Sequence, residues 1–211
     1  MTSETAFNSL KSIIKKTIRY GDFLIDTNRF SDRWIYTGSW NTEEARQSMQ
    51  TILTGFWTTF LHEHPEKHVL VTLEYLENYV EHEFPTGKIA QDVVEKLDHP
   101  RLCWKKLVVD PDSFELYMEQ WPTGCALIIF VEVSVRLDLL RAVYNNLHAL
   151  GCYVAAILAI VEYDEYSATE IRTTMDTELI PLLMYDEHQN HLYSILELQQ
   201  EPHCRYHSYF T

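Results

Sequence analysis

The sequence predicts an α/β domain in which a largely parallel sheet is flanked by helices. Apolar runs at residues 126–133, 153–162 and 178–186 alternate along the chain with amphipathic segments of helical period. Strands that are apolar on both faces are typical of parallel sheets, because helices cover both sides of such sheets. The chain has 211 residues, of which 46% are hydrophobic, so it has enough apolar surface for one core.

The first elements expected are a helix and a short hairpin. The helix is expected to end at Gly21, and its apolar face is formed by Phe7, Leu10, Ile14 and Ile18. Residues 22–40 mix aromatic and polar side chains, which indicates a short hairpin lying over the domain.

A second helix follows, with Asn41 and Glu44 as its expected capping pair. Its apolar stripe has helical spacing and consists of Ala45, Met49, Ile52, Leu53, Phe56, Trp57 and Phe60. This spacing predicts that one side of the helix packs on the sheet.

The rest of the chain predicts five strands, a third helix at Lys88 to Leu97 and a loop at residues 110–124. The strands are expected at residues 67–75, 101–109, 126–133, 153–162 and 178–186. Residues 1–211 are therefore predicted to form a single domain. Residues 1–40 would be an N-terminal helix and hood segment, and residues 41–211 the α/β core and C-terminal tail.

Charge and composition exclude several classes of protein. The formal charge is −14, from 31 acidic and 17 basic residues, and such a surface repels nucleic acid. We find no apolar run of the roughly 18 residues that a membrane span needs, and no signal peptide at the N-terminus. The four cysteines are widely spaced, without a C-x-x-C motif. Three of them lie in or beside predicted strands and are expected to be small core side chains, and a reducing, cytoplasmic setting is expected.

Two segments resemble a known family. Residues 21–36 read GDFLIDTNRFSDRWIY, and residues 131–139 read VEVSVRLDL ahead of a predicted helix. In order and spacing they are similar to the G-D-F-T-L-x-S-G-R-x-S-x-Y-Y-I-D and acidic-acidic-V-x-T-T-G-G-S patterns of the orotate phosphoribosyltransferases. The resemblance covers most of the chain, from Phe7 to Tyr185, and implies a phosphoribosyltransferase-like fold.

The resemblance also implies where a ligand site would lie. In that family the acidic pair binds the ribose of phosphoribosyl pyrophosphate, and the T-T-G-G-S turn holds its 5′-phosphate. Val131 and Glu132 stand at the acidic pair, and residues 135–139 stand at the turn. Glu132 and Arg136 are therefore the expected ligand-binding remnants. The turn has no glycine or hydroxyl, and Asp138 would repel phosphate.

Other matched positions agree with this loss. Lys105 and Lys106 match the start of the family's basic catalytic loop, after which the sequence departs from the pattern. Asp26 replaces a family lysine, and Tyr163 replaces an arginine that contacts the orotate base. The two lysines are expected remnants of the catalytic loop, with a solvated basic pair as the alternative.

We expect no metal and no cofactor. Histidines cluster at residues 62–68 and 203–207, but neither cluster has the H-E-x-x-H spacing, so surface histidines are expected. Gly87-Lys88 lacks the remainder of a phosphate-binding P-loop motif.

The sequence thus predicts a non-catalytic phosphoribosyltransferase-like protein that acts through protein–protein contacts as a structural, scaffolding or regulatory partner. The resemblance implies a homodimer. The alternatives are a divergent orotate phosphoribosyltransferase and a sensor of a nucleotide or phosphoribosyl ligand. Four aromatic residues are candidate interface anchors, with a place in the protein's own core as the alternative for each: Trp34, Trp40, Tyr206 and Phe210.

Overall fold

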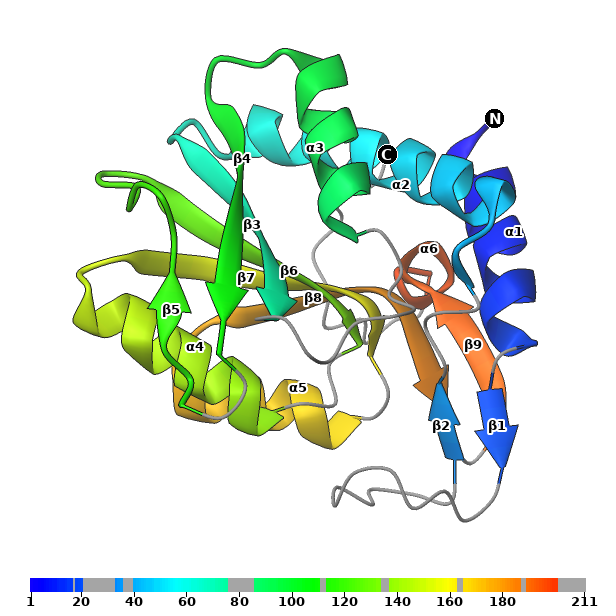
Figure 1. Cartoon of the computed structure of the whole chain (residues 1–211). Helices are drawn as coiled ribbons and strands as arrows, with labels where there is room; N and C mark the ends of the chain where they lie inside the picture. The colour runs from blue at the N-terminus through cyan, green and yellow to red at the C-terminus, as the bar shows by residue number, and fades with distance from the viewer. Residues whose placement is uncertain are drawn as a thin grey trace.

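The computed structural model describes residues 1–16, 18–20, 33–35, 40–75, 86–110, 113–133, 137–162, 165–186 and 189–200. These residues form a seven-stranded sheet in the order β5-β4-β3-β6-β7-β8-β9 (Figure 1). Its strands are β3 (His68–Tyr75), β4 (Leu102–Val109), β5 (Leu116–Tyr117), β6 (Ala126–Val133), β7 (Tyr153–Glu162), β8 (Glu178–Asp186) and β9 (His191–Ser194). Strands β4, β3, β6, β7 and β8 are parallel, and the edge strands β5 and β9 are antiparallel to their neighbours. The predicted α/β class with a largely parallel sheet is confirmed.

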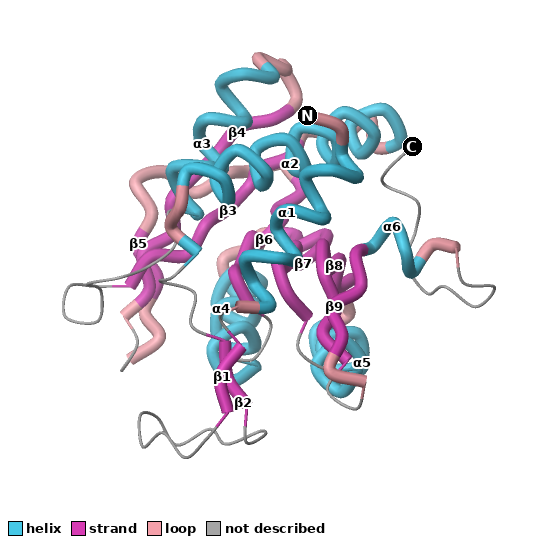
Figure 2. Tube along the Cα trace, turned by 90° about the vertical axis from the view of Figure 1, so that its right-hand side faces the viewer, coloured by secondary structure: helices cyan, strands magenta, loops and turns pink. Residues whose placement is uncertain are grey.

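Helices cover both faces of the sheet, and each face has its own core (Figure 2). The helices are α1 (Ser3–Lys15), α2 (Glu43–Glu63), α3 (Thr86–Leu97), α4 (Leu137–Ala149), α5 (Glu165–Met175) and α6 (Ile195–Leu198). The first three pack on one face together with α6, and α4 and α5 pack on the other. In the described part of the chain, no helix is both long and apolar enough to cross a membrane.

The first helix is shorter than its apolar pattern predicts. Phe7, Leu10 and Ile14 are buried as expected, but α1 ends at Lys15. Ile18 begins β1 (Ile18–Tyr20), which pairs antiparallel with β2 (Arg33–Ile35). The prediction that the helix continues to Gly21 is therefore wrong. The predicted hairpin is present as this strand pair. Its first strand lies just before the predicted segment, and its second strand lies within it.

The second helix is capped one residue later than predicted. The side chain of Thr42, rather than that of Asn41, accepts a hydrogen bond from the backbone N–H of Ala45 at 3.1 Å. A threonine hydroxyl in this position satisfies one of the free N–H groups of the first turn. The predicted apolar stripe is confirmed, since all seven of its side chains are buried.

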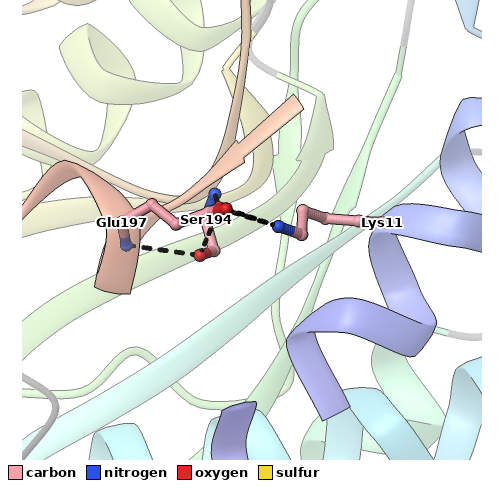
Figure 3. Close-up of polar contacts among 3 residues, drawn as sticks. All are labelled: Lys11, Ser194 and Glu197. Atoms are coloured by element: carbon pink, nitrogen blue, oxygen red, sulfur yellow. Dashed lines mark hydrogen bonds and ion pairs between the residues drawn. The ribbon is translucent and has the colours of Figure 1, made fainter. Parts of the chain in front are cut away.

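A contact between the two ends of the described chain fastens α1 to the main sheet (Figure 3). The Lys11 ammonium donates to both carboxylate oxygens of Glu197 at 2.8 Å, across 186 residues of sequence. Ser194 caps α6, and its backbone N–H and hydroxyl donate to the same carboxylate at 2.6 and 2.7 Å. Burial opposes ionisation of this carboxyl, but the hydrogen bonds from Lys11 and Ser194 outweigh it and lower the pKa of Glu197.

Replacing Lys11 with methionine should lower the free energy of unfolding by about 1 kcal/mol at pH 7, because the side chain keeps its packing but loses its charge. The folded-state pKa of Glu197 lies below its ordinary value of 4.5. The contribution of the pair is therefore present above pH 4.5 and is lost as the pH falls through the folded-state pKa. Urea unfolding at pH 7 and pH 3 measures the difference. Lys15→Met, on an exposed position of the same helix, is the control. An equal loss for both variants at both pH values would contradict the assignment.

Candidate functional site

Polar side chains gather at the carboxyl ends of the central parallel strands, the edge where open α/β sheets bind ligands. Alternate residues of a strand face the same side. Leu70, Phe130 and Ile160 belong to the core beneath α1, α2 and α3. Further along the same strands, the side chains on this face change from apolar to polar. The polar residues that follow on this face are Thr72, Glu74, Lys106, Glu132 and Glu162.

The start of α3 closes over these strand ends. The Thr86 hydroxyl donates to Glu132 Oε1 at 2.8 Å. A Cβ atom placed on Gly87 would lie 3.4 Å from Thr72 Oγ1 and 3.7 Å from Glu74 Oε1. The indole N–H of Trp104 donates to the same Thr72 hydroxyl at 3.0 Å. The first turn of α3 thus lies in van der Waals reach of these strand ends. Thr86 is a site residue that the sequence reasoning missed.

The two lysines expected from a catalytic loop lie within β4 instead. Strand alternation directs Lys105 and Lys106 to opposite faces of the sheet, so they do not act as one basic pair. Lys106 Nζ lies 3.0 Å from Glu74 Oε2 and forms an ion pair with it. Lys106 thus belongs to the candidate site, where its charge is already balanced, whereas Lys105 does not.

Two glutamates end neighbouring strands at this edge. Glu132, at the end of β6, is half-buried and receives the hydrogen bond from Thr86. Glu162, at the end of β7, is fully buried with 0% exposure. Sequence reasoning singled out Glu132 but not Glu162, although an acidic residue that ends an apolar strand was a usable signal. Val131, the other member of the pair, packs toward the opposite core.

The first turn of α4 lies where the family resemblance puts the phosphate-binding turn. The helix begins at Leu137, and Asp138 in its first turn is exposed. Leu139 and Leu140 are 1% and 2% exposed and pack in the core beneath α4 and α5. Arg136 lies outside the described residues.

The interface candidates divide into one core residue and three that are not described. Trp40 has 0% exposure and packs in the core with α1 and α2, so its interpretation as an exposed anchor is wrong. The side chain of Trp34, and residues Tyr206 and Phe210, lie outside the described part of the structure.

The histidine segment 62–68 is not wholly at the surface. His62 is exposed and His64 is half-buried, but His68 is buried at the start of β3 with 1% exposure. Among the described residues, no three histidine, cysteine, aspartate or glutamate side chains come together in a way that could hold a metal ion. The second histidine cluster, at residues 203–207, lies outside the described range.

No protein-family model matches this chain, and no curated protein matches it either. Solved structures do match. Orotate phosphoribosyltransferase from Aeropyrum pernix is 16% identical, with a TM-score of 0.55, over 83% of this chain and 92% of that one. The enzyme of Mycobacterium tuberculosis is 15% identical with a TM-score of 0.55, over 85% of this chain and 96% of that one. It has also been solved with 5-phospho-α-D-ribosyl 1-diphosphate.

Adenine phosphoribosyltransferase from Saccharomyces cerevisiae gives a TM-score of 0.57 at 10% identity, over 82% of this chain and 98% of that one. These similarities establish a phosphoribosyltransferase-like fold for this chain. At such identities they establish the fold alone.

Proposed function

We propose that this chain is a non-catalytic phosphoribosyltransferase-like protein that acts through protein–protein contacts, as a structural, scaffolding or regulatory partner. The observation that carries the proposal is the first turn of α4. Position 138 bears a carboxylate, and the side chain at position 139 is part of the core.

The N-terminus of a helix attracts anions, because its free N–H groups and its dipole are positive. In a phosphate-binding turn the phosphate itself is the anion at the helix N-terminus, and glycines and hydroxyls let it come close. Here the exposed Asp138 supplies a negative charge to the first turn itself. A phosphate arriving at this turn would meet that carboxylate, so its binding is disfavoured.

The difference from the family's phosphate-binding turn is more than an absence of polar groups, because a core side chain occupies one position of the turn. The resemblance aligns the serine of the T-T-G-G-S turn with Leu139, which is 1% exposed and packs beneath α4. Returning a serine there would remove apolar side-chain volume from a packed core, which is costly. Position 139 of this chain therefore contributes to the stability of the core.

Two of the carboxylates at this edge are engaged with neighbouring polar groups. Glu74 pairs with Lys106 at 3.0 Å, and Glu132 accepts from Thr86 at 2.8 Å. The formal charge of −14 adds a repulsive field for a ligand that carries several phosphates. A binding pose for phosphoribosyl pyrophosphate would have to break these contacts or overcome this charge.

We therefore expect no turnover of orotate or adenine with phosphoribosyl pyrophosphate and magnesium. Loss of a single preorganised donor commonly lowers a rate by about a hundredfold or more, and here the whole turn is replaced. Product formation followed by chromatography checks this expectation. Turnover that Glu132→Gln abolishes would overturn the proposal, because this variant keeps the shape of the side chain and an acceptor for Thr86. Thr86→Val is the matched control, because it removes the hydrogen bond to Glu132 but keeps the negative charge of Glu132.

Calorimetry with phosphoribosyl pyrophosphate and magnesium distinguishes the proposed function from the alternative of a ligand sensor. The retained Glu132 at the end of β6 favours a phosphoribosyl-ligand sensor as the second candidate. Saturable heat without turnover would assign the protein to that class. An absence of heat supports a role that depends on protein contacts, for which the fold family suggests a homodimer as the first assembly to look for.

A further inference from the structure

Two cysteines occupy neighbouring places at the amino ends of β6 and β7. The register of these parallel strands pairs Ala126 with Tyr153 and Leu127 with Val154. Cys125 and Cys152 immediately precede these two strands, so continuation of the register would place their Cα atoms side by side. Neighbouring strands lie about 5 Å apart, and disulfides join residues whose Cα atoms are about 4.4–6.8 Å apart.

Both thiols lie on the same side of the sheet. Cys152 is 8% exposed and belongs to the core beneath α4 and α5, and Cys125 packs against the same core. Their sulfurs also contact one short segment. Cys125 Sγ lies 3.5 Å from the carbonyl oxygen of Thr123, and Cys152 Sγ lies 4.0 Å from that of Pro122. Both thiols therefore lie against the same short segment that leads into β6.

The backbone before each cysteine turns at a glycine. Gly124 and Gly151 precede the two cysteines and have φ angles of +67° and +77°. Glycine adopts this region without steric cost. No atom lies within 4 Å of where a Cβ would sit on either glycine. These two glycines therefore form the turns through which the chain enters β6 and β7.

The two thiols differ in access. Cys125 is half-buried, whereas Cys152 is buried, and burial raises the pKa of the Cys152 thiol. Cys103 is exposed on β4, and β3 lies between β4 and β6. Cys125 is thus the accessible member of the pair. Cys103 is the competing partner for it, because burial and, to a smaller extent, the nearby Cys125 thiol raise the pKa of Cys103.

We propose that Cys125 and Cys152 are a redox-responsive thiol pair that low-molecular-weight disulfides oxidise to a disulfide between β6 and β7. The Cys125 thiolate attacks one sulfur of oxidised glutathione, forming a mixed disulfide and releasing one glutathione thiolate. The Cys152 thiolate then attacks the Cys125 sulfur and releases the second glutathione thiolate. Two protein thiols are oxidised, one glutathione disulfide is reduced to two thiols, and the two protons pass to the released thiolates.

The test uses the folded full-length protein with oxidised glutathione, followed by alkylation, intact mass measurement and peptide mapping without reductant. The expected product has lost two hydrogens and yields one cross-linked peptide pair that contains Cys125 and Cys152. Cys125→Ser and Cys152→Ser should abolish the product. Cys103→Ser should form it to the same extent, which makes it the matched control.

Peptide mapping of the unsubstituted protein identifies the cross-linked cysteines even if Cys152→Ser fails to fold. A cross-link from Cys125 to Cys103 or Cys204 would overturn the proposal. A glutathione adduct that stays on Cys125 without resolution would overturn it too, because it would mean that Cys152 cannot reach the Cys125 sulfur. An absence of any oxidised product after the thiols of an unfolded sample have reacted completely would also overturn it.

Discussion

Replacing Trp40 with alanine should lower the free energy of unfolding by about 3–5 kcal/mol, as large-to-small changes of buried aromatic residues commonly do. Trp40 is among the largest fully buried side chains of the described chain, with 0% exposure. It lies two residues before the N-cap Thr42, in the core that α1 and α2 share. Its removal leaves a cavity that the surrounding helices can fill only in part. Urea unfolding followed by circular dichroism measures the change in midpoint.

Trp40→Phe is the matched control, since it keeps an aromatic ring and should cost less. The same experiment separates core residues from interface residues. Trp34→Ala and Phe210→Ala, tested by light scattering and by melting temperature, should reduce association without a change in stability if these side chains are anchors. A Trp40→Ala protein with an unchanged unfolding midpoint and a lost assembly would show that the core assignment of Trp40 is wrong.

His68 is expected to make the protein less stable in acid. Its side chain is buried, and within the described residues neither of its ring nitrogens makes a hydrogen bond of good geometry, although the backbone of His64 lies close enough to favour the protonated ring. The rings of Phe60 and Trp57 pack around it, with centroids 5.1 and 6.3 Å away. Burial lowers the pKa of His68 below its ordinary value of 6.5, and the nearby carboxylate of Glu66 opposes this shift without cancelling it.

Three charged or titratable groups influence this imidazole: Glu66, His64 and Arg101. Glu66 Oε1 lies 3.7 Å from His68 Nε2 and 3.6 Å from His64 Nδ1. The Arg101 guanidinium donates to the carbonyls of His64 and Leu61 at 3.0 and 2.6 Å, which holds a positive charge near the site. Protonation of His68 would therefore place a second cation in a mostly apolar surrounding.

The sign of the pH effect follows from linkage. The unfolded chain takes up a proton on His68 near pH 6.5, whereas the folded protein does so only at lower pH. Between these values the unfolded state binds more protons, so stability falls as the pH falls below 6.5 and levels off only below the folded-state pKa. His68→Leu should remove this part of the slope. It should also raise the free energy of unfolding by about 1 kcal/mol, because a buried polar ring without a well-formed hydrogen bond is replaced by an apolar side chain.

Unfolding measured from pH 5 to pH 8 checks this expectation, with His62→Gln on the exposed side of α2 as the control. The control should keep the acid slope of the unsubstituted protein. An unchanged slope in His68→Leu would mean that another group carries the acid sensitivity. A large loss of stability at pH 8 would mean that His68 makes a favourable contact in its neutral form.

Local pattern was enough to predict the parallel sheet and the long helix. Residues 126–133 and 153–162 are β6 and β7 because runs of apolar side chains suit a strand covered on both faces. The stripe from Ala45 to Phe60 predicted the buried side of α2, since a period of 3.6 residues is a property of the helix alone. In these segments the local preference and the tertiary burial agree.

The tertiary structure decided whatever depends on contacts between distant residues. Ile18 continues the apolar pattern of α1, yet it begins a strand because it pairs with Ile35. Lys11 meets Glu197 across 186 residues, and no pattern of local spacing encodes that contact. The sequence left two roles open for Trp40, one in the core and one at an interface. Its burial in the core that α1 and α2 share shows that it is a core residue. The common reason is that local sequence biases backbone and period, whereas the packing of whole elements chooses which groups meet.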